Sequence, residues 1–457
     1  MKTVVSPNEK VFAITKKNDL KPDKRFRLSA FTVPYSDSNG FIMKNIFSGE
    51  VMSLSQEEFS AATALKNEPA DLAYLEKHGI SGLARHRFIV EEDYSEPERY
   101  RDTVKLVKIM QNEKPGLKTY TILPTTACNA RCTYCYEEGY AVHTMTQETV
   151  DRLIDYICET KQEGKITLSW FGGEPLVCAK TITYICKQLE SRGVEFKSRM
   201  ITNGTLMTKE LAHEAKEVWK LGRVQVSLDG DRRDYTERKR YIDPVRHNYD
   251  TALRAIRYLA DEGIKVNLRV NFDRDSIVRL RPFLDEMKSL FGSDRNVKLY
   301  LSALYQEKST PDFIELERQM FELERYIREL GINNAEREKR NTAFRLNSCM
   351  ADSLDKSVVI DPQGRLFNCE HLPAENTWGN IFDGVTDRKR YKELCAPCEP
   401  DDKCRSCEFL PQCTPFYKKG CPGWFETCRE YQLLKTEYEL RAIAEKLARD
   451  TDNGKDI

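Results

Sequence analysis

The sequence predicts an α/β protein whose central part is a parallel sheet or partial barrel. Between about 118 and 305, six strand-like segments alternate with amphipathic helical stretches, as expected when a crossover helix follows each strand. A smaller module of strands and short helices precedes this series, and a Cys-rich region without helical periodicity follows it. The chain has 457 residues, so more than one domain is expected.

The N-terminal part reads as a short segment followed by a small α+β module. Residues 1–24 are polar and are expected to be loosely ordered, whereas residues 25–92 contain strands and two short helices. FRLSAFTV and FIMKNIF read as strands on either side of the turn signal SDSNG. Ser55, followed by Glu58, predicts a helix that begins with a capping box. DLAYLEKHG reads as a second helix and HRFIV as a closing strand, and the charged residues 93–117 are expected to form a linker.

Residues 118–311 contain the strand–helix series. The expected strands are TYTILPT, KITLSWF, SRMITN, RVQVSLD, KVNLRVNF and VKLYLSAL, and the expected helices are 146–161, 179–192, 208–220, 247–262 and 276–291. A charged helical connector, 312–345, leads to the Cys-rich region, 346–430. An amphipathic helix and tail, 431–457, follow it.

The composition narrows the class of protein. Lys and Arg together number 72, as do Asp and Glu, so no overall charge favours nucleic acid or an anionic membrane as a partner. No apolar run reaches the ~18 residues needed to span a bilayer, and the N-terminus has no apolar signal core. We therefore expect a cytoplasmic protein. In that reducing compartment, 15 cysteines indicate metal binding or chemistry rather than disulfides.

The first group of cysteines is Cys128, Cys132 and Cys135, directly after an expected strand. Three thiolates on one loop can ligate three irons of a cubane cluster and leave the fourth iron open. The alternative is a zinc knuckle without its fourth ligand, but the spacing differs from the common C-x2-C zinc hairpins.

This C-x3-C-x2-C motif, with the aromatic Tyr134 before its last cysteine, resembles the radical S-adenosylmethionine superfamily. The resemblance implies a partial (β/α)6 TIM-like barrel and a [4Fe–4S] cluster whose open iron binds S-adenosylmethionine. In that family, one-electron reduction splits the cofactor and gives a 5′-deoxyadenosyl radical, which takes a hydrogen from the substrate. An electron donor such as flavodoxin or ferredoxin is therefore expected as a partner.

Motifs at later strand ends match positions where that family contacts its cofactor. Polar residues at the carboxyl ends of strands are where α/β active sites collect. The resemblance implies that Gly-Gly-Glu-Pro contacts the methionine amino group and that Tyr134 lies near the adenine. It also implies that Ser227, with Arg238 or Arg269, holds the ribose or carboxylate. The alternative for each of these residues is a purely structural role in a turn, a cap or packing. The expected cofactor-binding residues are Tyr134, Gly172, Gly173, Glu174, Pro175, Asn203, Ser227, Asp229, Arg238 and Arg269.

The second group of cysteines lies in 346–430, where Asp361–Gly364 predicts a turn between short strands. It resembles the SPASM extension of peptide-modifying radical enzymes, which carries two auxiliary [4Fe–4S] clusters, although seven residues rather than the usual three separate its third and fourth clustered cysteines. The resemblance implies one cluster on Cys404, Cys407, Cys413 and Cys428, and another on Cys349, Cys369 and Cys421. Cys395 or Cys398 could complete the latter, or one iron could stay open to a substrate thiolate. The alternative is a zinc ribbon on Cys395, Cys398, Cys404 and Cys407.

Residues 25–92 resemble the winged-helix modules with which peptide maturases recognise a leader peptide. In that family the leader adds a strand to an exposed sheet edge. The alternative is a cap without a ligand. A DNA-binding winged helix is disfavoured because no clearly basic face is present.

The function that these features favour is a maturase of a ribosomally made precursor peptide that forms a thioether or C–C crosslink. Oxidative crosslinking needs an electron acceptor, which gives the second group of cysteines a role. A sulfatase-maturating enzyme that converts Cys or Ser to formylglycine is the second possibility. A non-catalytic iron–sulfur or zinc scaffold is the third, and the motifs at the strand ends speak against it. Cys158, Cys178 and Cys186 lie on helical stretches and are expected to be buried small hydrophobic residues.

Overall fold

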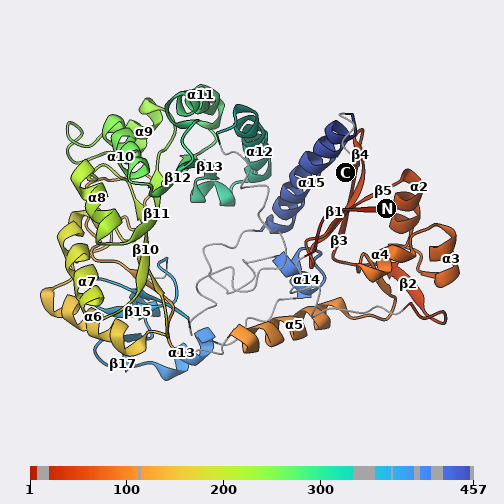
Figure 1. The fold of residues 1–457 in the computed structure, drawn as a ribbon, viewed down its shortest axis with the longest axis horizontal. Helices are drawn as coiled ribbons and strands as arrows, with labels where there is room; N and C mark the ends of the chain where they lie inside the picture. The colour runs from red at the N-terminus through yellow and green to blue at the C-terminus, as the bar shows by residue number, and fades with distance from the viewer. Residues whose placement is uncertain are drawn as a thin grey trace. The chain divides into compact units, whose positions relative to one another are not determined.

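The computed structural model describes residues 1–7, 20–111, 115–332, 356–371, 374–395, 402–412 and 426–452. They fall into two compact units. The terminal unit combines 1–113 with 398–457, and the barrel unit combines 114–337 with 349–397 (Figure 1). The expected Cys-rich region, 346–430, is therefore divided between the two units.

The barrel unit is built on a sheet in the order β13-β12-β11-β10-β9-β8-β14-β15-β16-β17. Its first six members run parallel and confirm the expected strand–helix series. They are β8 (Thr119–Ile122), β9 (Ile166–Trp170), β10 (Phe196–Thr202), β11 (Leu221–Ser227), β12 (Lys265–Phe272) and β13 (Val297–Ala303).

Helices cover the outer face of this sheet (Figure 1). The side chains that alternate toward them, such as Val224, Leu268 and Leu299, are almost completely buried. The charged helix α9 was not expected from the sequence; Asp231 caps its first turn. The helices of this unit are α6 (Gln147–Thr160), η1 (Pro175–Cys178), α7 (Ala179–Ser191), α8 (Lys209–Glu217), α9 (Arg232–Lys239), α10 (Tyr249–Asp261), η2 (Ile277–Arg279), α11 (Leu280–Phe291), η3 (Tyr305–Ser309) and α12 (Phe313–Leu330).

The inner face of the same sheet is divided into a polar part and an apolar part. Parallel sheets usually bury apolar side chains on both faces, so polar residues here need another explanation. On β10 to β13 the inner side chains include Arg199, Gln225, Asn267, Arg269 and Tyr300. Beside β8, β14 and β15 there is an apolar cluster: Leu123, which follows β8, packs with Val359 and Phe367, and Phe171 lies beside them. Thr121 of β8 and Ser357 of β14 are polar residues on the same face. The inner face therefore has the chemistry of a binding surface rather than of a core.

The sheet continues into the first part of the Cys-rich region. Strand β14 (Ser357–Ile360) pairs parallel with β8, and β15 (Arg365–Phe367), β16 (Gly379–Asn380) and β17 (Gly384–Val385) follow as an antiparallel ladder. The expected turn at Asp361–Gly364 is present, because the Gly364 amide donates to the Asp361 carbonyl. The short helices are η5 (Ala374–Asn376) and α13 (Arg388–Cys395).

The terminal unit contains two small antiparallel sheets. One has the order β1-β5-β4-β3 and the other β6-β2-β7. The strands are β1 (Lys2–Val5), β2 (Arg25–Leu28), β3 (Thr32–Asp37), β4 (Gly40–Asn45), β5 (Val51–Leu54), β6 (Ala70–Asp71) and β7 (Ile89–Glu91).

Two sequence expectations about these strands were wrong. FRLSAFTV is not one strand: the chain turns at Ser29, whose carbonyl accepts from the Thr32 amide, so β2 and β3 join different sheets. The loosely ordered segment expected at 1–24 contains β1, which pairs with β5. Four residues give too weak a local signal to reveal a strand whose pairing partner is distant in the sequence.

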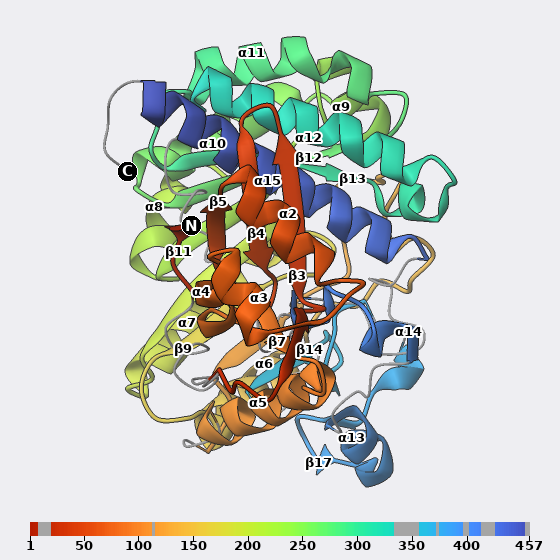
Figure 2. The same ribbon diagram turned by 90° about the vertical axis from the view of Figure 1, so that its right-hand side faces the viewer.

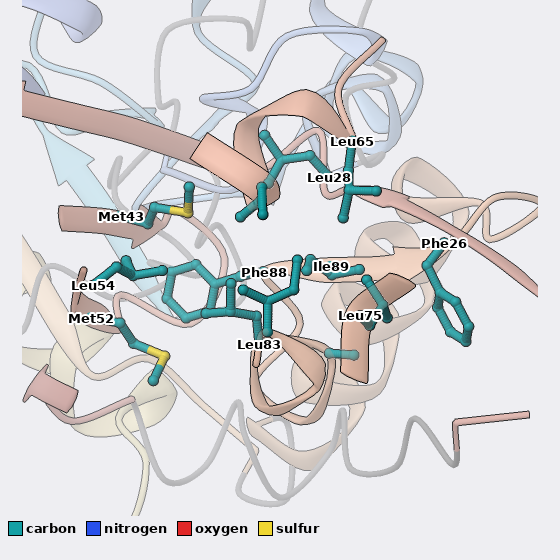
Figure 3. Packing of buried hydrophobic residues seen from close by; sticks show 14 residues of the cluster. Phe26, Leu28, Met43, Met52, Leu54, Leu65, Leu75, Leu83, Phe88 and Ile89 are labelled. Carbon is teal, nitrogen blue, oxygen red and sulfur yellow. The ribbon is translucent and has the colours of Figure 1, made fainter. Parts of the chain in front are cut away.

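The helices of the terminal unit are α2 (Gln56–Ala64), α3 (Leu72–Lys77), α4 (Ser81–Arg85), α5 (Glu96–Gln111), α14 (Asp402–Arg405), η6 (Leu410–Gln412) and α15 (Cys428–Asp452). The capping box of Ser55 and Glu58 is confirmed. Figure 3 shows Leu54, Leu83 and Phe88 in the core that joins α2, α3 and α4 to both sheets. None of the helices in the described ranges is both long and apolar enough to cross a bilayer.

A second core joins the last helix to the N-terminal sheet. Leu440 and Ala444 of α15, with Phe409 and Leu410, pack against Phe31 and its neighbours on β3 to β5 (Figures 1 and 2). Lys44, which is almost completely buried, forms an ion pair of 2.7 Å with Glu439. Residues 402–412 and 426–452 therefore share one core with the N-terminal module.

Candidate functional site

The loop that carries the first three cysteines follows β8 at the carboxyl ends of the parallel strands. It is held on one side by the loop after β9, where the Gly173 and Glu174 amides donate to the carbonyls of Thr125 and Ala127. A Cβ on Gly173 would lie 2.5 Å from the carbonyl oxygens of Thr126 and Ala127. Glycine is therefore required here because two backbones approach each other closely.

The C-terminal end of α9 holds the cysteine loop on another side. The Arg131 amide donates to the carbonyls of Lys239 and Arg240, at 3.1 and 3.0 Å, and the Thr133 amide donates to the Arg238 carbonyl at 3.0 Å. Arg240 adopts a left-handed conformation, with φ of 44°, which ends the helix. Main-chain hydrogen bonds from two separate elements thus fix the backbone between the cysteines.

The three thiols lie near one another on this loop. Cys128 and Cys132 are half-buried and Cys135 is exposed. Burial raises the pKa of all three thiols, and that of Cys128 to about 12. Metal binding would therefore release protons from them. In the described part of the chain, no three or more His, Cys, Asp or Glu side chains are gathered closely enough to hold a single metal ion.

Glu174 joins the loop after β9 to the end of β10 from a buried position. Its carboxylate accepts from the Thr202 hydroxyl at 2.6 Å and from the Asn203 amide at 2.8 Å. Burial raises the pKa of Glu174, although these hydrogen bonds oppose the rise. The Asn203 side chain in turn donates to Asn129, in the cysteine loop, at 2.8 Å. Glu174 and Asn203 thus position the backbone around the cysteines.

A second buried network lies beside Cys132. The Tyr134 hydroxyl donates to Asp229, and Lys239 lies 3.2 Å from the same carboxylate and 2.8 Å from the Tyr134 oxygen. The Asn271 side chain donates to the other Asp229 oxygen at 2.7 Å. Burial alone would lower the pKa of Lys239, but the nearby acidic groups, of which Asp229 has the largest effect, together outweigh it and raise that pKa well above its usual value. Lys239 is therefore held in its charged form, in an ion pair with Asp229.

The two expected arginines differ in their surroundings. Arg238 is buried and its guanidinium lies against protein partners: Ser276 at 2.7 Å, Asp273 at 2.5 Å and the Asn271 carbonyl at 3.0 Å. Arg269 projects from the inner face of β12 and donates to Ser302 at 3.1 Å, but its Nε is buried without a partner. Arg269 therefore has a donor left for a ligand, whereas Arg238 supports the loop after β12.

The other expected cofactor residues lie at the same sheet edge. Ser227 is the last residue of β11 and is paired in register with Arg269. Gly172 has a φ of 117° and its absent Cβ would meet the Thr125 carbonyl at 2.4 Å. Pro175 is the buried first residue of η1, which Glu174 caps. The structure thus brings these residues together at one end of the sheet, and their contacts to a cofactor stay predictions.

The auxiliary cysteines are divided between the units. Cys404, Cys407 and Cys428 lie in the terminal unit, where the Cys407 amide donates to the Cys404 carbonyl and an ion pair of 2.7 Å joins Glu408 to Arg429. Burial raises the pKa of Cys407, and the charge of Cys428 adds to the rise. Cys369 and Cys395 belong to the barrel unit. Cys349, Cys398, Cys413 and Cys421 lie outside the described residues, as does the side chain of Cys395.

Sequence reasoning missed Lys239, Asn271 and Asn129. Asn271 could have been found, because it lies near the end of a predicted strand, as Asp229 and Asn203 do. Lys239 lies in a run of charged residues and nothing in the sequence distinguishes it from its exposed neighbours. The expected burial of Cys178 and Cys186 is confirmed, whereas Cys158 is partly exposed.

Comparison with known families identifies the barrel. Residues 122–279 match the sequence profile of the Radical SAM superfamily, and this range contains all three cysteines, Glu174 and Asp229. The chain therefore contains a radical SAM domain, as the motifs predicted. The α/β architecture with a large parallel sheet is that of this fold.

Several relatives extend the match beyond this domain. The chain is 29% identical to Fe-coproporphyrin III synthase of Methanosarcina barkeri over 178 residues, which are 39% of this chain and 43% of that protein. It is 25% identical to the antilisterial bacteriocin subtilosin biosynthesis protein AlbA of Bacillus subtilis, over 59% of each chain. It is 24% identical to a serine-type anaerobic sulfatase-maturating enzyme of Klebsiella aerogenes, over 69% of this chain and 82% of that one. The chain thus spans about half the length of the first two relatives.

Two solved structures share the fold. One is native anSMEcpe with bound AdoMet and a Cp18Cys peptide, with a TM-score of 0.55 and 15% identity over 73% of this chain and 99% of that one. The other is Streptococcus suis SuiB bound to the precursor peptide SuiA, with a TM-score of 0.50 and 16% identity over 88% of this chain and 98% of that one.

Proposed function

We propose that this protein is a radical SAM enzyme that modifies a ribosomally made peptide, forming a thioether or C–C crosslink. The observation that carries the proposal is the joining of the cysteine loop, Gly173 and Glu174 at one end of the parallel sheet by main-chain hydrogen bonds. Relatives named for bacteriocin biosynthesis and sulfatase maturation support a peptide substrate.

The residues at this end of the sheet fit a cubane cluster and a polar cofactor. Cys128, Cys132 and Cys135 would hold three irons, and the loop offers no fourth thiolate. When bound, the cluster and S-adenosylmethionine supply a 5′-deoxyadenosyl radical for hydrogen abstraction. Arg269, with its unpaired Nε, would hold an anionic group of the ligand, and Ser227 lies beside it in the sheet.

Part of the inner face of the sheet is apolar and lies near the proposed reaction site. The apolar part of the inner face, Leu123, Phe171, Val359 and Phe367, would exclude water from the reacting atoms. Electrons released by an oxidative crosslink would pass to the auxiliary clusters, one of them on Cys404, Cys407, Cys413 and Cys428. A one-electron reductant such as flavodoxin or ferredoxin would complete the cycle.

Iron analysis tests this proposal. About twelve irons per chain should fall to about eight when Cys128, Cys132 and Cys135 are replaced together by Ala, at four irons per cubane. Cys132→Ala alone should abolish formation of 5′-deoxyadenosine, measured by chromatography after reduction with dithionite. Parental cleavage of S-adenosylmethionine by Cys132→Ala would disprove the cluster assignment.

Sulfatase maturation is the second candidate, because the match to the Klebsiella aerogenes enzyme covers 82% of that protein. The two reactions differ in the group that is formed. A crosslink and the conversion of Ser to formylglycine each remove a pair of hydrogens from the peptide, whereas conversion of Cys also replaces sulfur by oxygen. Formylglycine carries an aldehyde, so treatment of the modified peptide with 2,4-dinitrophenylhydrazine before mass spectrometry separates the candidates, because only formylglycine gains a hydrazone.

A further inference from the structure

The edge of strand β5 is occupied by strand β1 of the same chain. Lys2 is opposite Ser53, Thr3 is opposite Met52 and Val5 is opposite Val51, with an irregularity between Thr3 and Val5. The β1 side chains are exposed or half-exposed, whereas Val51, Met52 and Leu54 of β5 are buried. Val4 and Val5 are half-buried and pack against the core beside this sheet, and the ammonium group of Met1 forms an ion pair of 3.0 Å with Glu58. Strand β1 is therefore held by its main-chain pairing, two valines and one ion pair, and it is less buried than β5.

The other edge of this sheet is poorly suited to strand addition. It is formed by β3, which contains Pro34 and ends at Asp37. Proline lacks an N–H for pairing, and a charged residue on an edge disfavours a further strand. Within the four-stranded sheet, β5 is thus the edge that accepts an extended segment.

A buried carboxyl group lies where β1 crosses the start of β5. The Glu50 carboxylate is completely buried, and it contacts His86 at 2.9 Å. The Thr3 hydroxyl of β1 donates to the same carboxylate at 3.4 Å. At the other end of β1, the Met1 side chain lies against Gly82 of α4, where a Cβ would be 2.8 Å from it. The segment on the β5 edge therefore has a polar contact at Glu50 and an apolar contact at α4.

We propose that β1 occupies the site on β5 at which the substrate peptide binds and competes with that peptide. An extended segment of the peptide displaces β1 from β5, and Glu50 selects a side chain with a hydroxyl or ammonium donor at the position of Thr3. The inference rests on the proposed peptide substrate and adds to it a competing segment and a selecting residue. Strand addition gives affinity through the main chain, so the Glu50 contact supplies the selectivity.

The sequence of β1 supplies the probe. A fluorescein-labelled peptide, MKTVVSP, is titrated anaerobically into the full chain and into a variant that lacks residues 1–7. We expect the truncated variant to bind the peptide at least tenfold more tightly, measured by fluorescence anisotropy. Replacement of Thr by Val in the peptide, or Glu50→Gln in the protein, should weaken binding severalfold. Lys66→Gln, on the exposed turn after α2, is the control variant and should change nothing.

Equal affinity of the two proteins for the peptide would overturn the proposal, as would no binding by a truncated variant with a parental circular dichroism spectrum. Dimerisation of the full chain, but not of the truncated variant, would instead indicate exchange of β1 between two copies and would also overturn the proposal. If the truncated variant does not fold, hydrogen exchange of the full chain decides: the Thr3 and Val5 amides must exchange at least tenfold faster than that of Met43 on β4. Cleavage of S-adenosylmethionine by the full chain is measured in parallel. If the full chain does not cleave it, the proposed function is contradicted, but the result of the peptide titration remains valid.

Discussion

The end of the barrel sheet and the edge of β5 are held in opposite ways. At the barrel end, the buried carboxylates of Glu174 and Asp229 accept hydrogen bonds from side chains and backbone of neighbouring strand ends, and Asp229 also pairs with Lys239. At the β5 edge, four exposed or half-exposed residues pair through the main chain, with support from Val4 and Val5, from the ion pair of the Met1 ammonium with Glu58 and from one hydroxyl that contacts a buried carboxylate. The first region is organised before any ligand arrives, whereas the second can exchange its occupant.

The difference follows from what each region is proposed to do. Radical chemistry requires reacting groups in fixed positions and the exclusion of water, so rigidity around the cysteine loop is useful. Recognition of an extended peptide requires an edge that is free for part of the time. A segment that covers such an edge, as β1 does, is therefore expected to have low local stability.

The largest effect should come from breaking the buried pair at the barrel end. Asp229→Ala leaves Lys239 charged and buried without its partner, which costs about 3–5 kcal/mol. Urea unfolding, followed by the fluorescence of the buried Trp170 and Trp219, should show this loss. Asp250→Ala is the matched control, because its pair with Arg232 is exposed and should contribute less than about 1 kcal/mol. Similar losses of unfolding free energy in both variants would mean that the buried pair stabilises the protein no more than the exposed pair does.

An intermediate effect should come from the close backbone approach at Gly173. Gly173→Ala places a Cβ 2.5 Å from two carbonyl oxygens, so the cysteine loop must move, at a cost of about 1–3 kcal/mol. We expect a substantial loss of bound iron with helical content unchanged. Gly222→Ala is the control, because nothing lies within 4 Å of the added atom. Full iron content in Gly173→Ala would show that the loop tolerates the displacement.

The smallest effect concerns His86, beside the β5 edge. Its hydrogen bond to Glu50 raises the pKa of His86 above the usual 6.5, although burial opposes the rise. Because the folded-state pKa is the higher one, the pair stabilises fully below about pH 6.5 and the contribution is lost as pH rises through the raised pKa. The side chain is 33% exposed, so no more than about 0.5 kcal/mol is expected. The difference in thermal midpoint between the parent and His86→Gln should shrink between about pH 6 and pH 8; a constant difference would exclude the ion pair as its source.

The sequence alone was sufficient for the barrel. The six strands and, apart from α9, the helices between them were found from periodicity, and the cysteine spacing identified the domain that the profile match confirms. Periodicity works here because each strand is followed by a crossover helix, so every element carries a strong local pattern. The turn at Asp361–Gly364 and the capping box at Ser55 were found for the same reason: their signals lie within a few residues.

The sequence was insufficient where residues distant in the chain decide the outcome. Strand β1 exists because β5 offers an edge, and FRLSAFTV breaks because its two halves find partners in different sheets. Lys239 belongs to the site because the C-terminal end of α9 is hydrogen-bonded to the cysteine loop, which is distant in the sequence. The cysteines of 346–430 form one series in the sequence, but strands β14 to β17 extend the barrel sheet, whereas residues 402–412 and 426–452 pack on the N-terminal sheet.

The amino-acid sequence by itself thus determined the kinds of groups present: three clustered thiols, glycines and polar residues at strand ends, and local strand and helix patterns. Only the tertiary structure decided which of those groups are buried together, because burial and pairing depend on contacts between segments far apart in the chain. In the tertiary structure, Arg238 donates to protein partners, whereas the Nε of Arg269 has none. The tertiary structure also places β1 on the edge of β5. A charge buried beside its partner and the same charge in water have very different energies, and no local sequence pattern distinguishes them.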